Sequence, residues 1–73
     1  MNTKEFNSDD ASLSVDLSEA RQAVKENRFK DALGLFEIIL KEDPNHIDSL
    51  YLASVSSRYL KKFDDSKKYI EQL

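Results

Sequence analysis

Apolar residues along this chain recur mostly at spacings of three and four, which is the period of an amphipathic α-helix. One glycine, one proline and few β-branched residues also favour helix throughout. The pattern predicts four helices. They begin at Asp16, near Lys30, at Asn45 or His46, and near Asp64 or Asp65, either of which could cap the last one.

Capping and stop signals mark the predicted helix ends. The Asp16 carboxylate can accept from the free amides of the first turn, with Glu19 at the capping-box position. Asn27 ends the first helix because Asn tolerates the left-handed conformation. Pro44 ends the second because it disfavours helical geometry at the preceding residue. The third helix runs to Leu60.

The second predicted helix has the broadest apolar face, so we expect it to be the best-buried element. This face comprises Ala32, Leu33, Phe36, Ile39 and Leu40. The stripe of the third helix comprises Leu50, Ala53 and Ser57, with Ile47 and Leu60 at its ends, and that of the fourth comprises Phe63, Ser66, Ile70 and Leu73. Gly34 lies inside the second helix at a cost of about 1 kcal/mol relative to alanine. It is either a tolerated exposed glycine or the point where another helix packs closely.

Two stretches, 27–32 and 61–66, read as copies of one another thirty-four residues apart. The matching continues downstream, where Phe36 falls opposite Ile70 and Ile39 opposite Leu73. A period of this length is typical of repeat proteins in which helix pairs stack side by side.

These residues resemble the tetratricopeptide repeat (TPR), a helix–turn–helix unit of thirty-four residues. The family's second-helix signature is present as Ala32, Phe36, Ile39 and Pro44, preceded by the small residue Ala20, the turn residue Asn27 and the aromatic Phe29. Repeat 1 would span 13–46 and repeat 2 would span 47–73, cut off at Leu73. The matching positions of repeat 2 are Leu50, Ala53, Ser54, Phe63, Ser66 and Ile70. Asp16 and Glu19 depart from the family's large apolar residues.

The resemblance implies an all-α fold, with antiparallel helix–turn–helix pairs stacked as a short TPR-like solenoid of four helices. Packing explains the pattern, because small side chains let helices approach while aromatic rings fill the gaps between pairs. The small residues are Ala20, Ala32, Ala53 and Ser66, and the aromatic residues are Phe29, Phe36 and Phe63.

In the family, the first helix of each pair lines a concave surface that holds a peptide. The resemblance places Leu17, Arg21, Val24, Lys25, Asp48, Tyr51, Leu52, Val55, Arg58 and Tyr59 on that surface. Tyr51, Val55 and Tyr59 are spaced four apart and form one ridge, which suits burial against a peptide or helix. Alternatively, a later helix of a longer protein covers the ridge. The Lys and Asn of the carboxylate clamp found in some members are replaced by Leu17, Arg21 and Leu52.

Nothing in the sequence favours catalysis or a cofactor. Cysteine is absent, and His46 is the only histidine and lies at a loop-to-helix junction. Neither a Gly-rich phosphate loop nor a nucleophile motif is present, and no spacing indicates a metal site. We therefore expect a protein that is not an enzyme.

The net charge is −3, of which residues 1–12 account for −2, so the predicted folded region, 13–73, is nearly neutral. Residues 1–12 are predicted to be a disordered tail. This balance does not favour nucleic acid, and the longest apolar run, 38–40, is too short to cross a membrane. We expect a cytoplasmic protein. The basic cluster of Arg58, Lys61, Lys62, Lys67 and Lys68 is either a solvated face or a patch for an acidic partner.

The sequence thus predicts a non-catalytic module that binds a protein or peptide, as the N-terminal TPR domain of a larger protein. Two repeats are fewer than such arrays usually need. The alternatives are self-association through exposed terminal helices, or a small helical adaptor or chaperone subunit that folds with its partner.

Replacing Phe36 with alanine tests the predicted core. We expect Phe36→Ala to lower the free energy of unfolding by about 3–5 kcal/mol, because it removes the largest side chain of the apolar face and leaves a cavity. Urea denaturation followed by circular dichroism measures the change. A cooperative transition near that of the wild type would contradict the assignment.

Overall fold

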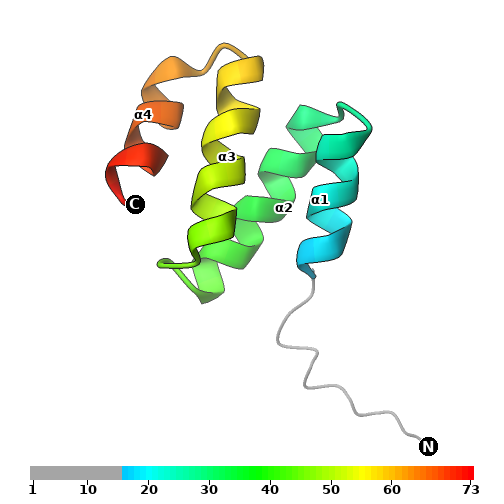
Figure 1. The fold of residues 1–73 in the computed structure, drawn as a ribbon, viewed down its shortest axis with the longest axis horizontal. Helices are drawn as coiled ribbons and strands as arrows, with labels where there is room; N and C mark the ends of the chain where they lie inside the picture. Colours follow the sequence, from blue (N-terminus) through cyan, green and yellow to red (C-terminus); the bar gives the residue numbers. More distant parts are fainter. Residues whose placement is uncertain (1–15) are drawn as a thin grey trace, which may run out of the picture.

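The computed structural model describes residues 16–73, which form four helices and no strand. They are α1 (Leu17–Lys25), α2 (Phe29–Glu42), α3 (Ile47–Tyr59) and α4 (Phe63–Glu71). Each helix runs antiparallel to the one before it and packs against it (Figure 1). The predicted all-α class of stacked helix pairs is confirmed. The expectation of a disordered tail, 1–12, lies outside the described residues.

The turns after α1 and α3 have the same geometry, thirty-four residues apart. Asn27 and Lys61 adopt left-handed conformations, with φ of 62° and 64°. In the first turn, the Arg28 amide donates to the Ala23 carbonyl oxygen at 2.8 Å; in the second, the Lys62 amide donates to the Ser57 carbonyl oxygen at 2.8 Å. Each turn is a Schellman motif. The period seen in the sequence is therefore also a period of the backbone, and the left-handed lysine was not predicted.

Side chains cap only two of the four helices. The Glu19 amide donates to Asp16 Oδ1 at 3.0 Å, as predicted, and this bond, with a smaller contribution from the Ser18 hydroxyl, lowers the pKa of Asp16. The Ser49 amide donates to His46 Nδ1 at 3.2 Å, so the single histidine caps α3.

The prediction that Asp64 or Asp65 caps the fourth helix is wrong. The helix begins at Phe63, and its N-cap residue is Lys62, whose side chain makes no capping bond. The reason is the preceding turn, which already holds the Lys62 backbone and so starts the next helix at once. Both aspartates instead lie in the first turn, where the helix dipole favours negative charge.

The core lies where α1, α2 and α3 meet. Phe36 is fully buried at its centre, packed among small residues. The four small residues predicted to allow close helix approach are all buried, namely Ala20, Ala32, Ala53 and Ser66. The core is therefore built from alanine and serine as much as from large side chains.

By number of buried residues α3, not α2, is the best-buried helix, contrary to the prediction. Six of its thirteen residues are buried, against four of fourteen in α2. Four of the six are serines: Ser49, Ser54, Ser56 and Ser57. The Ser54 hydroxyl donates to the Tyr51 carbonyl oxygen at 2.6 Å. Serine is not apolar, so the sequence pattern did not indicate that this side of α3 is buried. The small size of the serines lets α2 and α4 pack against α3.

Several residues predicted to be core are exposed. Phe63 and Ile70 of α4 are 62% and 44% exposed, and Ile47 at the start of α3 is 60% exposed. Leu73 is exposed as well. Of the predicted stripe of the fourth helix only Ser66 is buried, because α4 packs mainly on α3 within residues 16–73. The expectation that Phe63 fills a gap between helix pairs is therefore wrong.

Gly34 is approached by no other element of the described chain. A Cβ built at this position would meet nothing within 4 Å. The close packing of another helix at Gly34 therefore does not occur within residues 16–73. Among the helices of this region, none has the length and apolar character required to cross a membrane.

Relieving the left-handed strain at Lys61 should stabilise the fold. We expect Lys61→Gly to raise the free energy of unfolding by about 0.5–1 kcal/mol, because glycine adopts positive φ without a steric penalty. Lys67→Gly, inside α4, serves as the matched control and should lower it by about 1 kcal/mol. Urea denaturation measures both variants, and equal effects would contradict the role of Lys61.

Candidate functional site

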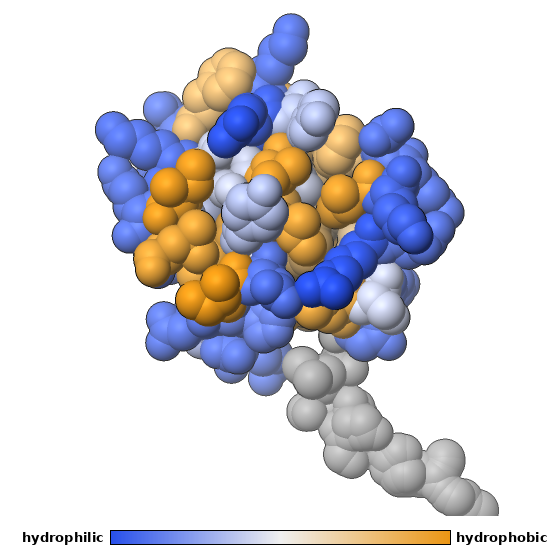
Figure 2. All heavy atoms as spheres, viewed as in Figure 1, coloured by the Kyte–Doolittle hydropathy of each residue, from blue (hydrophilic) through white to orange (hydrophobic). Residues whose placement is uncertain are grey.

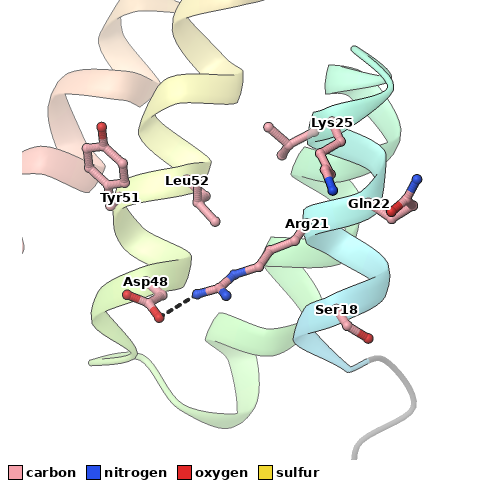
Figure 3. A pocket seen from close by; sticks show the side chains of 8 residues that line it. Ser18, Arg21, Gln22, Lys25, Asp48, Tyr51 and Leu52 are labelled. Atoms are coloured by element: carbon pink, nitrogen blue, oxygen red, sulfur yellow. Dashed lines mark hydrogen bonds and ion pairs between the residues drawn. The ribbon is translucent and has the colours of Figure 1, made fainter.

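A groove runs between α1 and α3 on one face of the molecule. Its volume is about 590 Å³. It is lined by Ser18, Arg21, Gln22, Val24, Lys25, Asp48, Tyr51 and Leu52 (Figure 3). The groove exists because α2 lies behind α1 and α3 and spaces them apart, with Arg21 of α1 and Leu52 of α3 directed into the gap (Figure 3).

One ion pair bridges this groove. Arg21 Nη2 of α1 lies 2.7 Å from Asp48 Oδ2 of α3 (Figure 3). Both side chains are about half exposed, so solvent screens the attraction, and its contribution to stability is at most about 1 kcal/mol. The pair therefore orients the two helices' side chains more than it stabilises the fold. It also compensates the charge of Asp48.

A second hollow of about 430 Å³ follows on the same helix, where α3 ends and α4 begins. It is lined by Val55, Arg58, Tyr59, Lys61 and Phe63. The ring of Tyr59 stacks on that of Phe29, with centroids 4.3 Å apart and an interplanar angle of 1°. Tyr59 is still 65% exposed. One face of its ring is therefore covered by Phe29, and the rest of the side chain is open to solvent.

Seven of the eight residues predicted to bind a partner line these two hollows. Arg21, Val24, Tyr51 and Leu52 line the groove, and Val55, Arg58 and Tyr59 line the second hollow. Leu17 does not line either; it is half-buried against the core. The predicted ridge of Tyr51, Val55 and Tyr59 thus lies along both hollows. We call the two hollows together the α3 face.

Figure 2 shows this side of the molecule, with apolar side chains between α3 and α1, a further apolar group on the side of α4, and hydrophilic residues along much of the rim. Tyr51, which belongs to the α3 face, is 56% exposed. Four further residues line the face and were not predicted from the sequence, namely Ser18, Gln22, Lys61 and Phe63. Lys61 and Phe63 could have been found only from the geometry of the turn that joins α3 to α4.

Positive charge predominates on the α3 face. Lys25, Arg58 and Lys61 form no ion pair with any residue of 16–73, whereas the acidic residue of the face, Asp48, is paired with Arg21. A ligand that covers the face would therefore meet an apolar surface flanked by three uncompensated cations.

No group of three His, Asp or Glu residues in 16–73 is arranged to hold a metal ion. His46 Nδ1 accepts a backbone hydrogen bond at the start of α3, away from both hollows. The α3 face presents exposed aromatic and apolar side chains beside cationic groups.

Comparison with protein-family models, curated proteins and solved structures gives no match to this chain.

The two tyrosines of the ridge should differ in their contribution to stability. We expect Tyr59→Ala to lower the free energy of unfolding by about 1 kcal/mol, because it removes the stack on Phe29. Tyr51→Ala should change it by less than about 0.5 kcal/mol, since this ring is a surface side chain. Chemical denaturation of both variants measures the difference, and equal losses would refute it.

Proposed function

We propose that this chain is a TPR-type interaction module that binds a protein or peptide on the α3 face. The observation that carries the proposal is the groove between α1 and α3, in which exposed apolar and aromatic side chains lie beside uncompensated cations. Clefts lined mainly by apolar side chains with a few polar groups are the usual binding sites of proteins.

The assignment to the TPR type is supported by the repeated backbone. The two Schellman turns lie thirty-four residues apart, each followed by an aromatic residue that opens the next helix, Phe29 or Phe63. Buried alanine or serine recurs at the same period, as at Ala32 and Ser66. The hydrogen bonds of the turns and the small residues at the helix crossings recur together, which is the behaviour of a structural repeat.

The chemistry of the face defines the partner that fits it. An extended peptide or helix with apolar side chains would bury Tyr51 and Leu52, and carboxylates beside them would meet Lys25 and Arg58. Complementary charge favours the correct partner and speeds its association, while the aromatic anchor provides most of the affinity. We therefore propose an acidic amphipathic segment as the ligand. The module is proposed to be non-catalytic, cytoplasmic and without a cofactor.

A second candidate function is that of a small helical adaptor or chaperone subunit completed by its partner. The observation that favours it is the exposed apolar side of α4, where Phe63, Ile70 and Leu73 are uncovered. An adaptor of this kind would melt broadly when isolated and sharply when its partner is bound, whereas the module would melt cooperatively alone. A thermal melt of the isolated chain therefore distinguishes the two.

Selection from a displayed library of random short peptides tests the proposed function. We expect the selected peptides to combine Asp or Glu with aromatic or aliphatic residues, and to lose at least about tenfold in affinity for Tyr51→Ala. Arg58→Ala should weaken peptide binding mainly at low ionic strength, because salt screens the attraction between an exposed arginine and the carboxylates of the peptide.

Ile38→Ala is the matched control, since Ile38 is exposed on α2 and lines neither hollow. It should leave peptide affinity unchanged. Isothermal titration measures all three variants. Peptides that bind Tyr51→Ala as well as the wild type would contradict the proposed site.

A further inference from the structure

The outer side of α2, opposite the core, carries one unusual stripe. Asp31, Gly34, Ile38 and Lys41 succeed one another at intervals of three, four and three residues, so they share a single face of the helix. The core residue Phe36 lies on the opposite side and is fully buried. We call these four residues the α2 stripe.

Gly34 leaves a recess in this stripe. Two hollows of about 470 and 510 Å³ meet at Gly34 and Ile38, one on each side of the helix. Gly34 has a negative φ, and a Cβ would meet nothing there. The chain therefore carries a helix-weakening residue that neither its backbone conformation nor its internal packing requires. The side chain missing at Gly34 leaves room for the close approach of a second molecule.

Ile38 is the matching projection. It is 40% exposed and is the large hydrophobic residue of α2 that faces solvent. Gly34 and Ile38 lie two residues before and after Phe36, and Asp31 and Lys41 lie five residues before and after it. A second α2 laid antiparallel, with the two Phe36 positions level, would set Ile38 of each copy against Gly34 of the other.

The charges agree with this alignment. In the antiparallel pair, Asp31 of each copy faces Lys41 of the other, so both ends of the stripe meet opposite charge. A parallel pair would set Asp31 against Asp31 and Lys41 against Lys41. Asp31 is 63% exposed and its one ion pair is with Arg28 at 3.1 Å, within the same turn, while Lys41 has no partner in residues 16–73.

We propose that two copies of this chain associate through antiparallel packing of the α2 stripe. The contact is isologous, since the same residues serve both sides, and knob-into-hole packing of Ile38 at Gly34 forms its centre. It leaves the α3 face free, because no residue of the stripe lines either hollow of that face. A single pair of helices buries a small area, so the association is weak and depends on concentration.

Sedimentation equilibrium of the full chain over a range of concentrations up to about 1 mM tests the proposal, because this range includes weak dissociation constants. The expected result is a reversible monomer–dimer equilibrium. A monomer at every concentration overturns the proposal.

Two substitutions in the stripe and one outside it locate the contact. Ile38→Lys should lower the association constant by about tenfold or more. Gly34→Gln should abolish association while raising the melting temperature by about 4–8 °C, because it removes a helix-interior glycine; the loss then has no explanation in unfolding. Ile70→Lys is the control, since Ile70 is 44% exposed on α4. Association that survives Ile38→Lys but is lost in Ile70→Lys overturns the proposal.

A charge exchange tests the antiparallel direction. Asp31→Lys should weaken association by placing lysine against lysine at both ends of the contact. The double variant with Lys41→Asp restores opposite charges and should return the association constant to within about threefold of the wild type, as expected for compensating surface pairs. Failure of the double variant to recover, with its melting temperature unchanged, overturns the antiparallel arrangement.

Discussion

Small buried residues on α3 let α2 and α4 pack closely against it, and this packing sets how the three helices are arranged. Ala53 and four serines are buried on α3. The axes of α2 and α4 can therefore each lie close to the axis of α3, without large side chains in between. Small residues at the crossings pack the backbones densely, and dispersion contacts accumulate over the whole surface of contact. Three of the buried serine hydroxyls, those of Ser49, Ser56 and Ser57, have no partner in the described residues.

Close packing of small residues has a consequence for the large ones. Phe36 occupies the centre of the core, but much of the remaining large apolar surface has no room between the helices and is turned outward. Tyr51 and Tyr59 on α3, Ile38 on α2 and Ile70 on α4 are all exposed. A fold with small residues at its crossings therefore has apolar side chains available for contacts with other molecules, and their positions differ from helix to helix.

The α3 face and the α2 stripe differ in the interactions they offer. The α3 face combines an aromatic ridge with cations left uncompensated, because the only ion pair across its groove, within residues 16–73, joins Arg21 to Asp48. The partner proposed for it is one that brings its own negative charge. The α2 stripe instead contains both signs of charge and both a recess and a projection, so it is complementary to itself.

The helical class, the number of helices and the thirty-four-residue period could be predicted from the sequence, because spacing, Asn27 and Pro44 are local signals. Helical periodicity also indicated Phe36 as core, and seven of the eight candidate partner-binding residues, placed by the family resemblance, line the α3 face. The tertiary structure was needed to show that Lys61 adopts a left-handed turn and that serine-rich α3 is central. It also decided that Phe63 and Ile70 remain exposed. The reason is that burial depends on the neighbours of a helix. Apolar character marks a residue that can be buried, but within residues 16–73 α4 packs mainly on α3, and this packing leaves Phe63 and Ile70 exposed.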